Sequence, residues 1–218
     1  MRAVFRVDAS TEIGSGHVIR CLTLAERLSR EAWEIHFICR DLPGNMAEFV
    51  EAKGFRMHLL PRPPEGNMHG PVPGTPAHAG WLGVHWKKDA AETADVLRVA
   101  GEDIDWLIVD HYAIDAGWES WLQSVAKRIM VIDDLADRAH HCELLLDQNL
   151  TRNAGQRYDG LLEPDCRILL GPRYCLLRRE FSDARKKLCV LFRPEYIIKP
   201  ANSNRLHQQK KQQRIKDH

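Results

Sequence analysis

Residues 3–30 read AVFRVDASTEIGSGHVIRCLTLAERLSR, and this stretch decides the fold. A short apolar run, residues 3–7, is followed by a polar loop with two glycines that extends from Asp8 to Gly16. Apolar residues then recur at helical spacing through about Arg30. A strand, a glycine-containing loop and an amphipathic helix are the usual beginning of a β-α-β unit, in which the next strand lies parallel to the first.

The same alternation continues along the chain. Helical patterns cover about residues 46–53, 87–99 and 118–126. Six more apolar runs have the length of strands: residues 34–39, 55–60, 105–110, 128–132, 144–147 and 167–171. We therefore predict an α/β fold with a Rossmann-like parallel sheet and helices on both faces. The predicted domain covers residues 1–184 and includes a long loop, 61–80, that holds six prolines.

The charge of the chain is unevenly distributed. The 218 residues include 31 Lys and Arg against 30 Asp and Glu, a net charge of +1. Ten of the basic residues and two of the acidic ones lie in 185–218, so this segment carries +8 and residues 1–184 carry −7. A domain of −7 is a poor binder of phosphate backbones, and we expect no nucleic-acid partner. The basic segment has few apolar residues and is predicted to be a disordered tail.

The sequence also indicates a compartment. No run approaches the 18 or so apolar residues of a membrane span, so no membrane partner is expected. The N-terminus is interrupted by charge too early for a signal peptide. The six cysteines form no C-x-x-C pair and most lie in apolar runs, which is typical of reduced, buried thiols. We predict a cytoplasmic protein.

The loop after the first strand is the first candidate site. Open parallel sheets bind ligands beyond the carboxyl ends of their strands. Gly14 and Gly16 would let the backbone approach a ligand, and the amides of the first helical turn would favour an anion such as a diphosphate. The loop is not a P-loop, because no G-K-[ST] follows. It also departs from G-x-G-x-x-G, since Ile19 stands in place of the third glycine.

His17 is the candidate catalytic residue of this loop. The positive end of a helix dipole disfavours the imidazolium cation, which suits a general base near neutral pH. Asp8 and Arg20 are close in sequence and could orient or clamp a substrate. The alternative interpretation, a histidine that only caps or packs the helix, stays open on the residues alone.

Several spaced motifs carry a resemblance to a known family. Residues 6–25 fit R-x-D-A-S-x-x-I-G-x-G-H-x-x-R-C-L-T-L-A. Further matching stretches follow in order: FICRDLPGN at 37–45, WLGV at 81–84, DHY at 110–112, VIDDLADR at 131–138, LLGP at 169–172 and LLRREF at 176–181. Over about residues 1–187 the chain resembles the UDP-2,4-diacetamido-2,4,6-trideoxy-β-L-altropyranose hydrolase family of pseudaminic acid biosynthesis.

The resemblance implies a fold and a reaction. Members are similar in fold to two-domain GT-B glycosyltransferases, and residues 1–184 would be the N-terminal half. They hydrolyse the anomeric C–O bond of the UDP-sugar with inversion, without a metal or another cofactor, and release UDP and free sugar. By this resemblance His17 takes the proton of the attacking water, and the Gly14, Ser15 and Gly16 amides lie against the diphosphate or sugar. Asp8, Arg20 and Tyr112 would complete the substrate site.

Other residues are weaker candidates. A polar group after the fifth strand could be interpreted as a metal site, but its spacing matches no zinc pattern, so we predict a structural or cleft-shaping role. That group comprises Asp133, Asp134, Asp137, His140, His141 and Cys142. Gln148 and Asn149 follow another strand end and are candidates for ligand contact. The tryptophans Trp81, Trp86, Trp118 and Trp121 are predicted to be core or lid residues.

The end of the chain departs from the family pattern. The second half of the family fold should begin after Phe181, yet no glycine occurs after Gly171. We therefore expect an N-terminal half with a truncated or aberrant C-terminus, and impaired activity of the chain alone. Two alternatives remain: a GT-B-like glycosyltransferase that passes the sugar to an acceptor, and a non-catalytic fragment.

Overall fold

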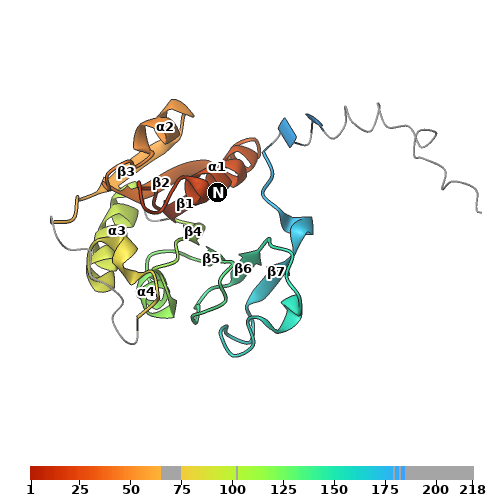
Figure 1. Cartoon of the computed structure of the whole chain (residues 1–218). Coiled ribbons are helices and arrows are strands. Elements are labelled where there is room, and N and C mark those ends of the chain that lie inside the picture. The colour runs from red at the N-terminus through yellow and green to blue at the C-terminus, as the bar shows by residue number, and fades with distance from the viewer. Residues whose placement is uncertain (65–74, 102, 179, 182, 185–218) are drawn as a thin grey trace, which may run out of the picture. The chain divides into compact units, whose positions relative to one another are not determined.

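The computed structural model describes residues 1–64, 75–101, 103–178, 180–181 and 183–184 (Figure 1). Residues Met1–Leu177 form one compact unit around a seven-stranded sheet. All six strand pairs in the sheet are parallel, which confirms the predicted Rossmann-like α/β class. The predicted tail and residues 65–74 of the predicted long loop lie outside the described residues.

The predicted strands and helices are all present, with boundaries shifted by a few residues. The strands are β1 (Arg2–Val7), β2 (Glu34–Arg40), β3 (Arg56–Leu60), β4 (Trp106–Asp110), β5 (Ile129–Ile132), β6 (Leu144–Asp147) and β7 (Arg167–Leu170). The helices are α1 (Gly16–Ser29), α2 (Ala47–Ala52), α3 (Trp86–Ala100) and α4 (Ala116–Leu122). Short 3₁₀ turns are η1 (Ala79–Leu82), η2 (Ala154–Gln156) and η3 (Pro172–Tyr174).

The strand order places β1 in the interior of the sheet, beside the central strand β4. The order is β3-β2-β1-β4-β5-β6-β7, so the chain first builds outward from β1 to β3 and then returns to the other side of β1 with β4. The direction of winding therefore reverses between β1 and β4. In open α/β sheets a reversal of this kind leaves a crevice at the carboxyl ends of the two strands, where ligands bind.

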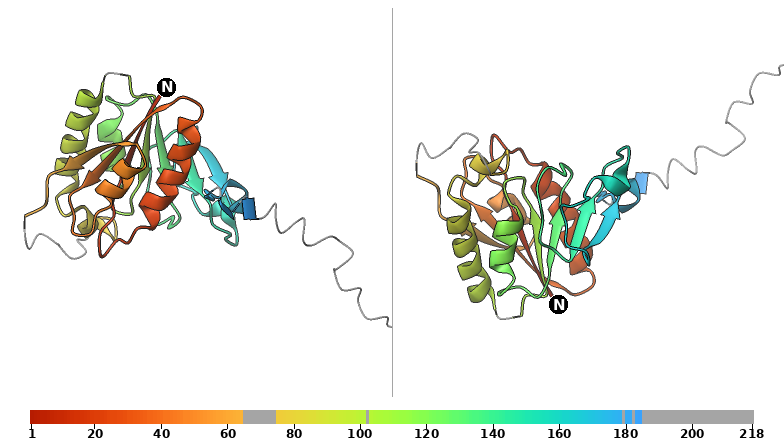
Figure 2. Two further views of the ribbon diagram at one scale, coloured as in Figure 1. Left: turned by 90° about the horizontal axis from the view of Figure 1, so that it is seen from above. Right: turned by 90° about the horizontal axis from the view of Figure 1, so that it is seen from below.

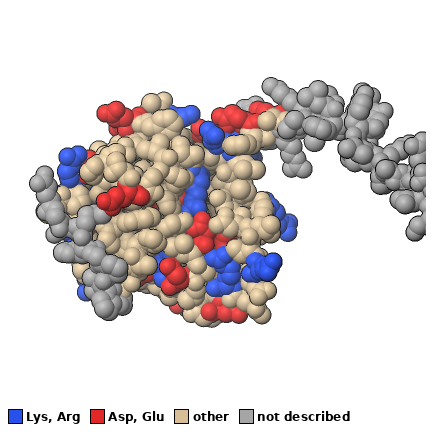
Figure 3. Space-filling view, in the orientation of Figure 1, with Lys and Arg blue, Asp and Glu red and all other residues tan. Residues whose placement is uncertain are grey.

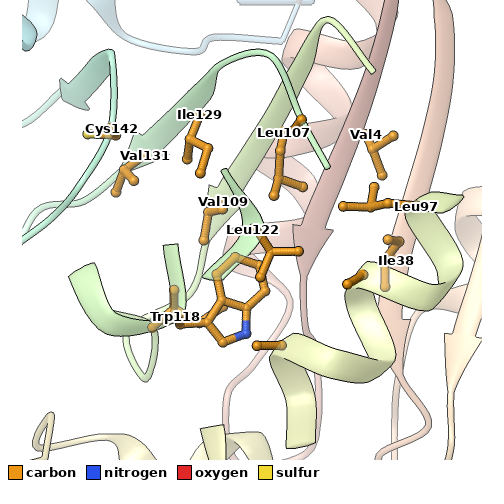
Figure 4. Close-up of a cluster of buried hydrophobic side chains, with 14 of the residues drawn as sticks. Val4, Ile38, Leu97, Leu107, Val109, Trp118, Leu122, Ile129, Val131 and Cys142 are labelled. Atoms are coloured by element: carbon orange, nitrogen blue, oxygen red, sulfur yellow. The ribbon is translucent and has the colours of Figure 1, made fainter. Parts of the chain in front are cut away.

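Helices cover both faces of the sheet (Figure 2). On one face α1 and α2 pack against Phe5, Phe37 and their neighbours. On the other face α3 and α4 pack against residues such as Val4 and Leu107, and Trp118 of α4 is completely buried there (Figure 4). Because β1 is buried on both faces, residues 3–7 are all buried rather than alternately exposed, and the one charged residue among them is Arg6.

Four charged residues are buried on the α3 side of the sheet and form what we call the buried charge cluster. They are Arg6, Asp8, Arg40 and Asp89, and none has measurable exposure. Arg6 pairs with Asp8 at 2.6 Å and with Asp89 at 2.7 Å. Arg40 pairs with Asp89 at 2.7 Å, and the Trp118 indole N–H donates to the same carboxylate at 2.9 Å. Each buried charge is thus neutralised by a partner, as burial requires.

The surface carries both signs of charge. On the face shown in Figure 3, acidic and basic side chains are interspersed and do not gather into one patch of a single sign. In the part of the chain that the structure describes, no helix combines the length and the apolar composition needed to cross a membrane.

Candidate active site

The carboxyl edge of the sheet between β1 and β4 brings together the first-strand loop and the end of the fourth strand. Val7, the last residue of β1, lies opposite Asp110, the last residue of β4. The loop after β1 leads directly into α1, whose first turn carries His17. Two segments 93 residues apart therefore meet at the carboxyl edge of the sheet, and the sheet topology itself brings His17 to Asp110.

His17 and Asp110 form a hydrogen-bonded pair. Nδ1 of His17 lies 2.6 Å from Oδ1 of Asp110. A carboxylate can only accept, so this short contact requires a proton on Nδ1, and the tautomer with its proton there keeps a lone pair on Nε2. The His17 side chain is 10% exposed, and within the described residues Nε2 makes no hydrogen bond. The ring is thus oriented with a free basic nitrogen, as a general base requires.

Arg20 holds the other side of the same carboxylate. One turn after His17 on α1, its Nε and Nη2 atoms lie 2.5 and 2.6 Å from the two oxygens of Asp110, a bidentate pair. Burial alone would raise the pKa of Asp110, but the bonds from Arg20 and His17 outweigh it and hold the pKa below its ordinary value. Asp110 therefore stays a carboxylate, and it fixes the tautomer of His17.

Asp134 joins four segments at this site. The residue follows β5 in sequence, and its carboxylate accepts from Tyr112 Oη at 2.5 Å and from Arg20 Nη1 at 3.1 Å. Asn149, after β6, donates to the same carboxylate at 3.2 Å. Arg157, after η2, donates to the backbone oxygen of Asp134 at 2.8 Å. Asp134 is therefore the common acceptor for side chains that come from α1 and from the loops after β4 and β6.

Aromatic rings stand beside the His17 imidazole. The Tyr112 ring meets it edge to face, with centroids 4.6 Å apart and planes at 84°. The Trp81 ring of η1 stacks on the Tyr112 ring, with centroids 5.8 Å apart, and the centroid of the His78 ring lies 4.5 Å from that of Trp81. These three rings are half-buried, so they form an apolar wall at the edge of the site. Trp81 was expected in the core or in a lid, and the structure places it on this wall.

The glycine loop is exposed next to His17. Gly14 has φ +78° and its N–H donates to the Ser10 carbonyl at 2.8 Å, which closes a tight turn. Gly14, Ser15 and Gly16 are all exposed. Ser15 precedes α1 without capping it through its side chain, and the first turn of α1 has no acidic residue. The positive end of α1 is therefore open to an anionic ligand.

Asp8 is placed differently from the other predicted site residues. It is completely buried, and its carboxylate accepts from Arg6 and from the backbone N–H of Arg40 at 2.7 Å. His111 Nε2 lies 3.1 Å from the same carboxylate. Burial raises the pKa of Asp8, but the charge of Arg6 and the bond from His111 lower it far more. The structure thus brings His17, Arg20 and Tyr112 together in one site and places Asp8 in the buried charge cluster beneath the loop.

The polar group considered for a metal is divided among separate contacts. His140 Nδ1 pairs with the buried Glu119 at 2.7 Å, and Asp133 pairs with Arg138 at 2.8 Å. The hydroxyl of Tyr158 donates to Asp133 at 3.0 Å. Among the described residues no three His, Cys, Asp or Glu side chains are grouped so that they could hold a metal ion. His140 therefore ties the segment after β5 to α4, and Asp133 ties it to Tyr158 in the segment after β6.

Sequence reasoning missed two residues of the candidate site. Asp110 appeared only within a matching motif, and Asp134 only in the group predicted to have a structural or cleft-shaping role. The available signal was their position, because both stand at or just after the carboxyl end of a predicted strand, where a parallel sheet gathers its ligand-binding groups. Asn149, a weak candidate, is brought to the site through Asp134.

Comparison with known proteins identifies a curated relative. No protein-family model matches the chain. Over 188 residues the chain is 26% identical to the UDP-2,4-diacetamido-2,4,6-trideoxy-beta-L-altropyranose hydrolase of Campylobacter jejuni subsp. jejuni serotype O:2. The match covers 86% of this chain and 56% of that protein, so the chain spans about half the length of the curated relative it matches. This confirms, at the level of the family, the relationship that the motifs predict.

A search of solved structures finds a distant likeness. The N-terminal domain of Candida albicans trehalose-6-phosphate phosphatase matches with a TM-score of 0.41 and 11% identity, over 68% of this chain and 40% of that chain. A likeness of this size carries no argument about function.

Proposed function

We propose that this chain provides the catalytic half of a nucleotide-sugar hydrolase that converts UDP-2,4-diacetamido-2,4,6-trideoxy-β-L-altropyranose to UDP and the free sugar. The observation that carries the proposal is the His17–Asp110 pair, with its free Nε2, at the reversal point of the sheet. The relative named as a hydrolase of this UDP-sugar supports the choice of substrate.

In the proposed reaction His17 acts as the general base. Nε2 takes a proton from a water molecule while the water oxygen attacks the anomeric carbon from the face opposite the leaving group. The bond between that carbon and the phosphate oxygen breaks, its electron pair stays on the oxygen, and UDP leaves. Attack from the opposite face inverts the anomeric centre. The imidazolium that forms is stabilised by the Asp110 carboxylate, which stays ionised between His17 and Arg20.

The leaving group explains why one base is enough. Most inverting glycosidases use a second carboxyl group, which protonates a poor leaving group. UDP leaves as a stabilised anion, so the site needs mainly donors for the charge that develops on the diphosphate. We assign this role to the amides of Ser15 and Gly16 and to the positive end of α1, which are exposed, while the Gly14 amide bonds the Ser10 carbonyl and shapes the turn that presents them.

The remaining predicted residues enter the proposal in supporting roles. Tyr112, held by Asp134, faces His17 and would contact the sugar. Arg20 orients the base through Asp110 and lies at the edge of the diphosphate site. Asp8 supports the loop from below through Arg6 and the backbone of Arg40.

The proposal includes a second Rossmann-like domain of the GT-B kind. In that architecture two such domains face each other across a cleft, and the one opposite the catalytic loop binds the nucleotide. The described residues provide the base and the positive end of α1, which together account for the sugar and diphosphate side of such a cleft. The relative, which is longer than this chain, has room for the second domain.

The test is an assay of UDP-sugar hydrolysis. The reaction is monitored by NMR through the anomeric proton signals of the substrate and the product. We expect UDP and free sugar in equal amounts, at the impaired rate expected of this half alone, and His17→Ala should reduce that rate by about 10²–10⁴-fold. His141→Ala, which changes a histidine outside the crevice, is the matched control and should keep the rate. Transfer of the sugar to an acceptor would replace the proposal with a glycosyltransferase. Absence of turnover, together with unchanged His17 ring signals on addition of the UDP-sugar, would contradict it.

A further inference from the structure

Two cysteines lie in contact where β6 and β7 begin. Cys142 stands two residues before β6, and Cys166 immediately precedes β7. The strands are parallel neighbours, with Leu144 opposite Arg167. The two Sγ atoms are 3.7 Å apart, although 24 residues separate them in the chain. The pairing of the two strands therefore holds the thiols together in the folded protein.

The pair differs from the other described cysteines. Cys21 and Cys39 are buried in the core on the α1 face, where burial raises the pKa of each thiol. Cys175 is half-exposed, and the structure shows no thiol partner for it among the described residues. Cys142 and Cys166 are the described pair whose sulfur atoms lie within hydrogen-bonding distance. They combine a close partner with access for a reagent, because Cys166 is half-exposed.

The two thiols have complementary acidities. The hydrogen bond from Cys142 lowers the pKa of Cys166 below its ordinary value. The same bond, together with burial, raises the pKa of Cys142. The thiolate is the nucleophilic form of cysteine, so Cys166 is the sulfur that reacts first and Cys142 is the sulfur that follows.

We propose that Cys142 and Cys166 are an oxidation site, which a hydroperoxide converts from two thiols to a disulfide. The Cys166 thiolate attacks the peroxide oxygen, the O–O bond breaks, and a sulfenic acid and hydroxide form. The Cys142 sulfur then attacks the Cys166 sulfur, the S–O bond breaks, and the oxygen leaves as water. The two thiols lose two electrons in total, and hydrogen peroxide is reduced to two molecules of water.

The geometry requires little movement. A disulfide has sulfur atoms about 2.05 Å apart, so the present separation must close by less than the width of an atom. The bond would tie the starts of β6 and β7, which already lie side by side. It would also close a loop that carries Asn149 and Arg157, both of which bond Asp134. Oxidation thus acts on the segment that completes the candidate site.

The experiment treats the intact chain with an equimolar amount of hydrogen peroxide and digests it without reducing agent. We expect a mass lower by two hydrogen atoms, one peptide pair that joins Cys142 to Cys166, and full reversal by dithiothreitol. Cys175→Ser is the matched control and should leave the cross-link in place. In Cys142→Ser the cross-link should be lost, and a sulfenic acid that dimedone can trap should accumulate on Cys166.

Three results would overturn the proposal. One is a cross-link that joins Cys166 to another cysteine. Another is oxidation of Cys166 to the sulfinic acid in the wild-type chain, with no cross-link formed. The third is equal peroxide reactivity at Cys166 and Cys175. Peptide mapping of the peroxide-treated wild-type chain detects each of these results without any variant, so the proposal remains testable even where a variant fails to fold.

Discussion

Nδ1 of His17 and Oδ1 of Asp110 lie 2.6 Å apart, although 93 residues separate the two in the chain. The contact exists because β1 and β4 are neighbours in the sheet, so the loop after one strand meets the end of the other. The pair gives the imidazole one tautomer and one orientation before any ligand is present. Substitutions in this pair should therefore change turnover, whereas substitutions in the buried charges and loops beneath it should change the free energy of unfolding.

Asp110→Asn should remove the base function while the fold is kept. The asparagine amide can donate to Nδ1, which would move the ring proton to Nε2 and leave no lone pair for water. We expect UDP release to fall by about 10²–10⁴-fold and the Nδ1 proton signal of His17 to disappear. Asp105→Asn, the same change near the opposite end of β4, is the control and should retain the rate. An unchanged rate in folded Asp110→Asn would show that His17 is not the base.

Asp134→Asn should release Tyr112. Burial and the bond to Asp134 raise the pKa of the Tyr112 phenol well above its ordinary value. Loss of the carboxylate should bring this pKa back toward about 10, measured from the ring carbon signals of Tyr112 against pH. Turnover should fall by roughly 10- to 150-fold, since hydrogen bonds to charged groups contribute about 1.5–3 kcal/mol.

Asp137→Asn serves as the control for Asp134→Asn. Asp137 is three residues along, and its carboxylate pairs with Arg138 rather than with Tyr112. A Tyr112 pKa that does not move in Asp134→Asn would assign the shift to burial alone.

Acid should destabilise the protein in two stages. Burial lowers the pKa of His111, so below about pH 6.5 the unfolded chain binds a proton at this residue while the folded chain does not. The free energy of unfolding therefore falls as the pH is lowered through this range. The pKa values of Asp89 and Asp110 are lowered too, because bonds to arginines outweigh the burial that would raise them. Their stabilisation is present above about pH 4 and is lost as pH falls through their folded-state pKa values.

The free energy of unfolding in urea should therefore decline with pH by up to about 1.4 kcal/mol per pH unit for each group that titrates. His111→Gln should abolish the decline in unfolding free energy that this residue causes below about pH 6.5. The decline at lower pH, which comes from Asp89 and Asp110, should remain. A free energy that stays constant from pH 7 to pH 3 would contradict the assignment of these buried charges.

Gly44→Ala should destabilise the loop that precedes His17. Gly44 has φ +78°, and an added Cβ would lie 3.0 Å from Thr11 Cγ2 and 3.2 Å from the Thr11 backbone nitrogen. Gly160→Ala is the matched control, since Gly160 has φ +75° and open space around the same position. Both variants should lose about 1 kcal/mol from the backbone, and Gly44→Ala more than that because of the contact. Equal losses of unfolding free energy in the two variants would show that Thr11 and its loop shift away from the added Cβ at no cost.

The strands and helices could be predicted because their residues carry the signal locally. Parallel strands that are buried on both faces are nearly continuous apolar runs, so β4 and β5, and β1 apart from Arg6, stood out between polar segments. Helix α1 was found from the spacing of its buried residues. The strand order was not contained in these patterns, because the same alternation of strands and helices fits several orders.

The candidate site could be predicted only in part, for the same reason. His17 and the glycines lie in one continuous stretch, so local reasoning found them. Asp110 and Asp134 reach His17 and Arg20 only through the pairing of β1 with β4 and of β4 with β5. Asp8 shares the stretch with His17, yet its side chain enters the core. A list of neighbours in sequence does not show on which side of the sheet each one lies.

The buried charge cluster limits how the sequence can change. Removal of Arg6 alone leaves two buried carboxylates with one cation fewer, and removal of Asp89 alone leaves two buried guanidinium groups without their shared anion. Breaking a buried ion pair by removing one partner costs about 3–5 kcal/mol, a large part of the stability of a domain, so a single substitution at one of these positions should destabilise the protein strongly. We expect these four positions to be inherited as a unit and to be exchanged only together, which makes them a marker of descent independent of the catalytic residues.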